Sequence, residues 1–402
     1  MILHRNGYIK LLRPLLLFVL CLFFSSSSFA GQYAIKPYLE TGIKQENNYF
    51  KSQTTKRKVN VYNVRPGIDF GYTTDKSSIM FDYNFDVIKY DDQDDVPVGA
   101  IKANSLDYTG HNGSLTAETQ ATDRLLIGLD DSLTRTREPD ATDALSDSTD
   151  KSLYWTNAIT PRMRYTFGEK LYTELKYTNL ILDYKDDVNN EDSKEDRGTF
   201  VVGYNFNETT GFDLNYQIWE REYDKTSSDY QSNQLMLNVY KQFRVVLFSA
   251  GGGYNKRDFK QAAVKDLDSF TGQISMDGQL PKSRFHLGVN YGLNDSGAGN
   301  FYYKATRLEG SFGHLFFEKI DFNVSGYYQL SDYEGRDRKD DTWQVAGKLY
   351  YLFNDYIAFG AEAGYETRDS NDVNAISGLE DKNYDNYWGM LNLKLNYDFA
   401  SR

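Results

Sequence analysis

One pattern repeats along almost the whole sequence: apolar and polar residues alternate with period two in segments of strand length. Residues 320–325, for example, read Ile-Asp-Phe-Asn-Val-Ser. Successive side chains of a β-strand point to opposite faces, so such a segment has one apolar face and one polar face. An amphipathic helix would instead repeat its apolar residues every three or four positions. The chain is therefore predicted to be all-β.

The alternating segments number about eighteen, and sixteen is the alternative count. We expect strands at 33–43, 59–72, 78–90, 104–119, 124–137, 152–167, 170–184, 196–206, 209–223, 231–243, 244–258, 268–280, 282–294, 300–315, 319–333, 341–353, 355–368 and 384–399. The segment at 104–119 is the least regular of them. Each segment is long enough to cross a bilayer as a tilted strand, which takes about 9–11 residues.

Short connections between these segments alternate with long polar ones. The short ones lie at Thr73–Ser77, Gln120–Asp123, Gly168–Glu169, Asn207–Glu208, Phe243–Arg244, Pro281, Phe316–Glu318 and Asn354. The long ones lie at 44–58, 91–103, 138–151, 185–195, 224–230, 259–267, 295–299, 334–340 and 369–383. Short periplasmic turns opposite long extracellular loops are typical of a transmembrane antiparallel β-barrel of the bacterial outer membrane. A propeller or a stack of sandwiches, the soluble alternatives, lacks this rhythm.

Aromatic residues are abundant, at 15% of the chain with 33 Tyr and 25 Phe. Several segments end in an aromatic pair just before a short turn: Tyr165 and Phe167, Tyr204 and Phe206, Tyr351 and Phe353, and Tyr397 and Phe399. Single aromatic residues mark the opposite segment ends: Tyr90, Tyr184, Tyr223, Tyr254, Tyr333, Trp343 and Trp388. We interpret both sets as girdles in the two headgroup layers, where an amphipathic ring has its body in lipid and its tip in water.

The first thirty residues have the order of a secretory signal peptide: a basic start, an apolar run of ten at 15–24, and small residues up to Ala30. The run is too short to cross ~30 Å of hydrocarbon as a helix. Cys21 lies inside it, without the small preceding residues that lipoprotein processing needs. We predict a cleaved signal peptide at 1–30 and a barrel integral to the outer membrane at 31–402.

Cys21 is the only cysteine of the chain. After cleavage, disulfides, thiol catalysis and cysteine metal sites are therefore excluded. Residues 1–30 carry three basic and no acidic side chains, so their removal changes the net charge from −12 to −15. A chain this acidic is not expected to bind nucleic acid.

Motifs for catalysis are missing from the sequence. His111, His286 and His314 are the histidines left after processing, and His111 and Ser114 are three positions apart, which places them on opposite faces of a strand. His-Glu-x-x-His, Gly-x-Ser-x-Gly and phosphate-binding glycine loops do not occur. We predict that the protein is not an enzyme and has no cofactor and no catalytic metal.

Several predicted loops are dense in carboxylates, including 91–95, 140–150 and 186–196. They lack the glycine and the final glutamate of an EF-hand loop. We expect them to be solvated and to meet lipopolysaccharide through bridging divalent ions. The loop at 138–151 is also a candidate for a constriction that folds into the lumen.

With an apolar outer face, the polar face of each segment lines the lumen. The predicted pore-lining side chains are Lys36, Glu40, Arg65, Asp69, Asp82, Arg124, Arg162, Arg164, Glu174, Lys176, Asp213, Trp219, Arg284, His286, Arg307, Glu309, Asp321, Lys348, Glu362 and Lys394. A barrel of 16–18 strands encloses a water-filled channel unless something plugs it. Charges of both signs can orient polar solutes in such a channel, or they can only brace the wall through cross-strand pairs.

The chain also resembles a known family. Its leader, its length and motifs such as Tyr204-Asn205-Phe206-Asn207-Glu208 before a strand resemble the barrels called beta-barrel porin 2. The resemblance covers nearly the whole mature chain and implies association with exopolysaccharide or exosortase gene clusters, and hence polysaccharide export. It supplies no catalytic motif. The last segment closes on Phe399, which resembles the signal read by the barrel-assembly machinery, although three residues follow it here.

Two functional hypotheses remain open. The first is a porin-like channel for polar solutes or exopolysaccharide, in which Trp219 would belong to an inward aromatic track for glycans. The second is a structural or adhesive barrel with a closed lumen, whose acidic loops contact the surface layer. In both, the expected partners are outer-membrane lipid, lipopolysaccharide and the barrel-assembly machinery, in a Gram-negative cell.

Overall fold

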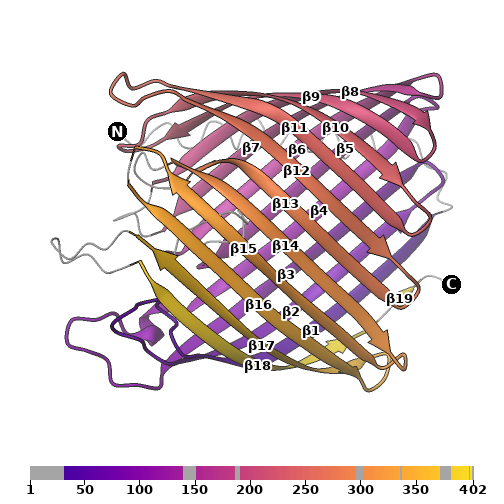
Figure 1. Cartoon of the computed structure of the whole chain (residues 1–402). Helices are drawn as coiled ribbons and strands as arrows, with labels where there is room; N and C mark the ends of the chain where they lie inside the picture. The colour runs from indigo at the N-terminus through magenta and orange to yellow at the C-terminus, as the bar shows by residue number, and fades with distance from the viewer. Residues whose placement is uncertain are drawn as a thin grey trace, which may run out of the picture.

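The computed structural model describes residues 31–138, 151–185, 191–295, 302–335, 337–371, 382–397 and 399–400, and the strands form one tilted ring (Figure 1). The strands are β1 (Gln32–Glu46), β2 (Val59–Thr73), β3 (Ser77–Asp92), β4 (Tyr108–Thr122), β5 (Leu125–Thr136), β6 (Tyr154–Phe167), β7 (Leu171–Tyr184), β8 (Ser193–Asn207), β9 (Thr210–Tyr223), β10 (Tyr230–Gln242), β11 (Val246–Phe259), β12 (Leu267–Gln279), β13 (Ser283–Asp295), β14 (Tyr302–Phe316), β15 (Ile320–Tyr333), β16 (Lys339–Leu352), β17 (Ile357–Ser370), β18 (Tyr384–Asn396) and the short β19 (Phe399–Ala400).

Each of the strands β1 to β18 pairs antiparallel with its neighbours in sequence, and β1 pairs with both β2 and β18. The β1–β18 register runs from Tyr38 opposite Asn396 to Glu46 opposite Trp388, and β19 continues the pairing at Ala34. The ring is therefore closed with eighteen long strands, which confirms the predicted barrel and its larger strand count. Closure leaves no unpaired sheet edge, as a membrane-spanning sheet requires.

The predicted strand boundaries agree with the observed ones to within three residues, with one exception. The segment predicted at 104–119 begins with a 3-10 turn, η1 (Ala103–Leu106), and β4 starts only at Tyr108. The amide of Ala103 donates to the Asp92 carboxylate at 2.7 Å, so a contact with another segment holds this stretch out of the strand.

The connections divide the barrel into two ends. Turns of two to four residues form the turn end: 74–76, 123–124, 168–170, 208–209, 243–245, 280–282, 317–319 and 353–356. The connections that the structure describes in full, 47–58, 93–107, 224–229 and 260–266, form the loop end, on the left in Figure 1. The connections 137–153, 185–192, 296–301, 334–338 and 371–383 contain residues outside the described ranges. At the β14–β15 turn, Phe317 and Glu318 both have positive φ, of 52° and 60°. This is the backbone of a type I′ hairpin turn, which matches the strand twist.

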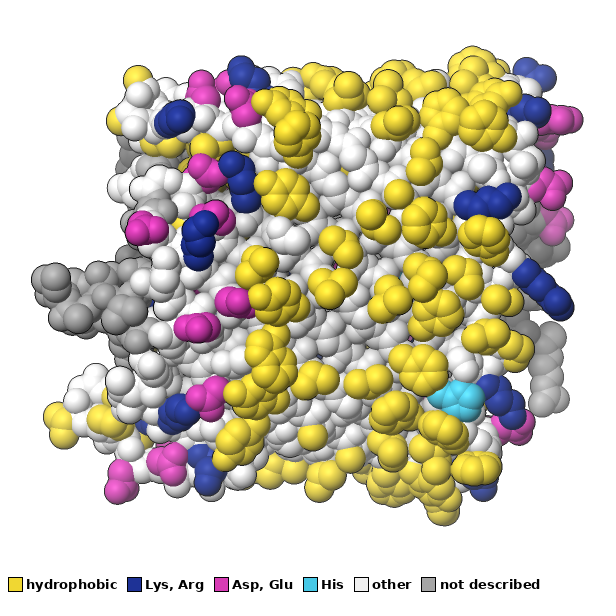
Figure 2. Space-filling view, in the orientation of Figure 1, with side chains coloured by type: hydrophobic (Ala, Val, Ile, Leu, Met, Phe, Trp, Pro, Cys, Tyr) yellow, Lys and Arg dark blue, Asp and Glu magenta, His cyan; other side chains and the backbone are white. Residues whose placement is uncertain are grey.

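The outward face carries a broad apolar band (Figure 2). In β10, for example, Leu235, Leu237 and Val239 occupy alternate positions and are exposed. At the turn end, Phe167, Phe206 and Phe353 are exposed as well, which agrees with the predicted girdle. Such an outer face suits lipid rather than water.

The predicted girdle at the loop end is partly wrong. Tyr254 and Trp343 are exposed on the outward face, but the strand registers place Tyr90, Tyr184, Tyr223, Tyr333 and Trp388 on the inward face. Position near a strand end does not distinguish the two faces, because a ring shifted by one residue along the strand points the other way.

Two other predictions, on His111 with Ser114 and on the segments 1–30 and 138–151, are compared with the structure next. His111 and Ser114 do lie on opposite faces of β4, and His111 contacts the outward Tyr83 and Trp155 rather than a nucleophile. The predicted signal peptide and nearly all of the loop 138–151 lie outside the described residues. Within the described ranges, helices long and apolar enough to cross a membrane are not found.

Candidate functional site

The inner wall is polar because the register places side chains of one kind side by side. Glu40 of β1 is opposite Arg65 of β2 and Lys394 of β18. One residue earlier, Leu39 is opposite Leu395 of β18. Since neighbours in register share a face, the alternation in each strand becomes one apolar outer and one polar inner surface.

The registers place the predicted pore-lining residues on this inward face, with the exception of Arg124. Arg124 lies in the turn between β4 and β5 and is exposed there. Arg124 was predicted to lie on the inward face of a strand, but it lies at the rim of the turn end. The reason is that the β4–β5 connection ends one residue later than expected.

Most of the inward charges are paired with a neighbour. Ion pairs join Arg65 to Asp86 and Glu40 (3.7 Å to Glu40), Arg162 to Glu118 and Asp130 (both 3.0 Å), Lys176 to Glu174 (2.6 Å), Arg284 to Asp321 (3.2 Å), Arg307 to Glu309 (3.1 Å) and Lys348 to Glu362 (3.1 Å). Several of these pairs stay partly exposed, so each stabilises the wall only modestly. They present both signs of charge to the lumen.

Four more of the predicted residues bind polar or aromatic partners. Asp82 accepts a hydrogen bond from the Tyr38 hydroxyl at 3.4 Å, Asp213 accepts one from Asn238 at 2.8 Å, Arg164 lies 3.8 Å from the Tyr172 ring, and Lys394 lies 5.5 Å from the Tyr38 ring. These contacts hold the four charged groups close to the barrel wall. The same side chains therefore brace the wall and line the lumen.

A hollow of about 360 Å³ opens in the inner wall near the turn end, between β10 and β14. Arg284, His286 and Asp277 line it together with Gln242 and Ser311. His286 lies 2.7 Å from the Asp277 carboxylate through Nδ1 and 3.7 Å from Glu309 through Nε2. Among the described residues, no three His, Cys, Asp or Glu side chains are arranged to hold a metal ion. The hollow therefore offers hydrogen-bonding groups to a polar solute.

The first loop (47–58) folds against the inner wall at the loop end. Tyr49 is 1% exposed and packs at 5.1 Å against Tyr90, an inward residue of β3. The ammonium of Lys151 lies 5.1 Å from the Tyr49 ring, and the Arg57 guanidinium lies 3.9 Å from the Phe50 ring. Burial raises the pKa of Tyr49 well above its usual range. This aromatic loop, which the sequence analysis gave only as a long polar connection, narrows the mouth of the barrel.

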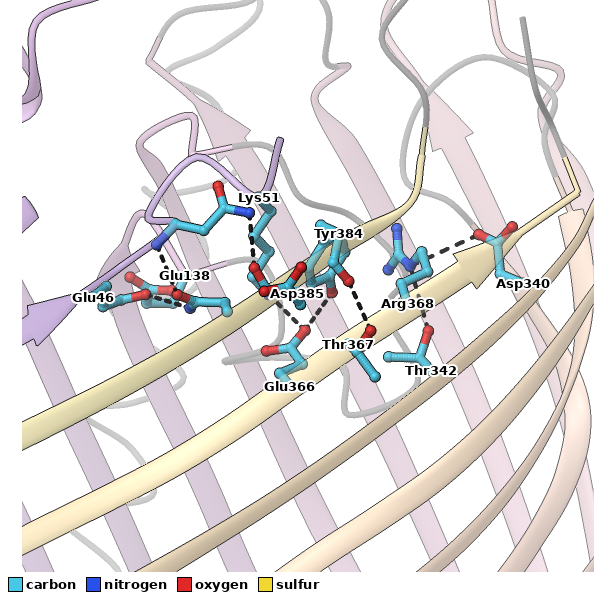
Figure 3. Close-up of polar contacts among 12 residues, drawn as sticks. Glu46, Lys51, Glu138, Asp340, Thr342, Glu366, Thr367, Arg368, Tyr384 and Asp385 are labelled. Atoms are coloured by element: carbon cyan, nitrogen blue, oxygen red, sulfur yellow. Dashed lines mark hydrogen bonds and ion pairs between the residues drawn. The ribbon is translucent and has the colours of Figure 1, made fainter. Parts of the chain in front are cut away.

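A buried ion pair ties the other side of the first loop to β17. Lys51 Nζ lies 2.8 Å from Glu366, and the two side chains are 17% and 11% exposed. Figure 3 shows Lys51 and Tyr384 converging on the Glu366 carboxylate, to which the Tyr384 hydroxyl also donates. Nearby, the Asn48 amide donates to Asn386 of β18 at 3.1 Å. The first loop thus spans from β3 to β17 and β18 across one side of the mouth.

The ends of the third loop, 137–153, join this cluster. Lys151 Nζ lies 2.7 Å from Glu138. Although burial alone would lower it, the Glu138 and Glu46 carboxylates raise the pKa of Lys151. A charged Lys151 therefore connects β1, the first loop and the third loop. Loop residues such as Tyr49 and Lys51 were missed in the sequence; the Tyr49-Phe50 pair inside a polar stretch was the available signal.

Trp219 does not form an open aromatic track. It lies on the inward face but is only 6% exposed, packed with Tyr230 and Tyr302. The Arg197 guanidinium covers it at 4.5 Å from the ring. A sugar stacking directly on this indole would first have to displace Arg197, so the track hypothesis is not supported at this residue.

The family comparison matches a carboxy-terminal segment of this architecture. Residues 249–397 match the model of the family putative beta-barrel porin 2. This confirms the family resemblance, over β11 to β18 rather than over nearly the whole chain. With the closed barrel, the match makes the chain similar to porin-like β-barrels of the outer membrane.

Solved structures of similar architecture come from outer-membrane proteins. OccAB4 of Acinetobacter baumannii has a TM-score of 0.48 and 12% identity, over 92% of this chain and 98% of that one. The outer membrane protein OpdK of Pseudomonas aeruginosa has a TM-score of 0.48 and 11% identity, over 91% and 99%. OccAB2 of Acinetobacter baumannii has 0.49 and 11%, over 91% and 98%. Comparison with curated proteins finds no match.

Proposed function

We propose that this porin-like barrel is a channel through which polar solutes cross the outer membrane. The observation that carries the proposal is the inner wall, where charges of both signs line a closed ring of eighteen strands. A ring of this size leaves an aqueous lumen when loops do not fill it. Paired charges along the wall favour polar and charged solutes over apolar ones.

Polysaccharide export is the finer form of this proposal, and it rests on the family resemblance rather than on a track of open aromatic rings. Lipopolysaccharide and the barrel-assembly machinery are proposed as partners on the same general grounds, because the outer face is apolar and the chain is a closed barrel. A second candidate, a structural barrel with a closed lumen, is favoured by the first loop, which is held inside the mouth by Tyr49 and Lys51.

Single-channel conductance of the refolded protein in a planar bilayer tests the proposal. Two adjacent positions of β12 form a matched pair: Ser275 is inward, opposite Ser249 in register, and Ile274 is outward and 51% exposed. The chain's own cysteine, Cys21, lies in the predicted signal peptide. In S275C, a charged, membrane-impermeant thiol reagent should change the conductance, and in I274C it should not.

Three outcomes separate the hypotheses. Stable conductance steps that respond to the reagent only in S275C support a channel. Added neutral oligosaccharides that block these steps extend the proposal to saccharides, whereas steps indifferent to sugars leave a general channel. Folded protein without any conductance contradicts the channel and supports the structural barrel.

A further inference from the structure

A patch on the inner wall at the loop end combines arginines with aromatic rings. We call it the Arg257 patch, and its residues are Arg197, Trp219, Arg221, Tyr230, Asn255 and Arg257. They come from β8 to β11 and are adjacent in register: Arg197 is opposite Trp219, Arg221 is opposite Tyr230, and Arg257 is opposite Ser232, which in turn is opposite Trp219. Shared register places all of them on the inward face.

Arg257 is buried, and no carboxylate of the described residues forms an ion pair with it. It is 3% exposed and lies 4.0 Å from the Tyr230 ring and 5.3 Å from the Tyr302 ring. Its Nε donates to the Ser232 hydroxyl at 3.1 Å, and its Nη1 is buried with no hydrogen-bond acceptor in the part of the chain that the structure describes. A buried charge is costly unless it is paired, and ring contacts compensate only part of that cost.

Unlike Arg257, the neighbouring Arg197 and Arg221 form ion pairs with carboxylates of the described residues. Arg197 lies 2.7 Å from Glu195, and Arg221 lies 3.6 Å from Glu195 and 3.5 Å from Asp295. Within the described residues, these two carboxylates face three guanidinium groups, so the patch keeps an excess of one positive charge. That excess falls on Arg257, the arginine without an ion pair.

Among the described residues, one further buried polar atom of the patch lacks both a hydrogen bond and an ion pair: Oδ1 of Asn255, an acceptor. Asn255 stands two residues before Arg257 on the same face of β11, and its Nδ2 is already used by Gln234 at 3.1 Å. The patch therefore combines the guanidinium of Arg257, which carries the excess positive charge, with an amide acceptor, and a solute reaches these buried atoms only when the rings over Arg257 move aside. A ligand that satisfies both carries a carboxylate and a hydroxyl group.

We propose that the Arg257 patch binds the carboxylate of a polyhydroxylated solute that enters the lumen, such as a uronic acid residue. This rests on the proposed function, because the solute reaches the patch through the channel. A uronic acid supplies the anion for Arg257 and hydroxyl donors for Asn255. The same carboxylate chemistry could come from a small dicarboxylic acid, which the test below separates.

Calorimetry on the folded protein in detergent tests the site with three probes: trigalacturonate, its methyl ester and glutarate. We expect trigalacturonate to bind, and the uncharged ester to bind at least tenfold more weakly. R257Q should weaken trigalacturonate binding at least tenfold, and R257K should retain part of it. The matched control is R338Q, because Arg338 also lies over a tyrosine, 4.1 Å from the Tyr333 ring, but has its own carboxylate in Asp340.

Each result decides one point. Equal binding of acid and ester, full binding by R257Q, or no binding by the folded wild-type protein overturns the proposal; in the last case water satisfies the orphaned atoms. Glutarate binding as tightly as trigalacturonate supports the carboxylate site and overturns the saccharide. Conductance without trigalacturonate binding refutes the site alone, and binding without conductance refutes the channel alone.

Discussion

Replacement of Glu366 by glutamine should release the first loop from the barrel wall. The change keeps the size of the side chain and an acceptor for the Tyr384 hydroxyl, but removes the anion 2.8 Å from Lys51. Both side chains are largely buried, and loss of one partner of a buried pair costs about 3–5 kcal/mol. Lys51 is 17% exposed and can turn toward water, so we expect a cost at or below the lower end of that range, about 2–3 kcal/mol. That corresponds to a factor of roughly 30 to 150 in the ratio of docked to undocked loop.

Limited trypsin digestion of the folded protein measures this ratio. The first loop carries four cleavage sites, Lys51, Lys56, Arg57 and Lys58, and all of them are present in E366Q. When closing is faster than cleavage, the cleavage rate follows the population of the open loop. E366Q should therefore be cut in this loop faster than wild type by one to two orders of magnitude. Its channel should also show larger and noisier conductance steps.

The matched control is D332N, because the Asp332–Lys339 pair has a similar 2.9 Å contact but is 58% and 66% exposed. An exposed pair contributes little, so D332N should digest at the wild-type rate. The reasoning is refuted if E366Q is cut at the wild-type rate, or if D332N accelerates cleavage of the first loop as much as E366Q does.

Three further predictions follow from other parts of the barrel. A Cβ at Gly364 would lie 2.2 Å from the Trp388 ring, whereas Gly347 has nothing within 4 Å; G364A should cost about 1–3 kcal/mol and lower the temperature at which the folded band disappears on gels, and G347A should not. L237R places a charge in the outward band and should cost about 2–4 kcal/mol in bilayer refolding titrations; wild-type stability would contradict the lipid-facing assignment. Burial alone would raise the pKa of Glu191, but hydrogen bonds from residues 226–227 lower it. The contact between Glu191 and these residues should therefore stabilise the loop above the usual glutamate pKa, and this stabilisation should be lost as the pH falls through the lowered pKa. Amide exchange of residues 226–227, corrected for intrinsic rates, should become faster in that pH range, and unchanged protection would refute the prediction.

The sequence determined the architecture because the information is local. Alternation with period two, as in residues 320–325, sets which side chains can share a face, and the short and long connections order the strands. Since antiparallel neighbours pair in sequence order, this is enough to predict a closed ring of eighteen strands and the inward face that carries Arg162, Arg284 and Lys348.

Only the tertiary structure decided what fills the mouth and how the charges are partnered. Tyr49 and Lys51 belong to an irregular loop, where no periodicity assigns a face, and their partners are distant in sequence: Glu366 is 315 residues from Lys51. Arg257 cannot be distinguished from Arg307 along the strand, yet within the described ranges Arg307 has a carboxylate partner and Arg257 does not. Such differences depend on side chains from several strands meeting in the lumen, which local patterns do not encode.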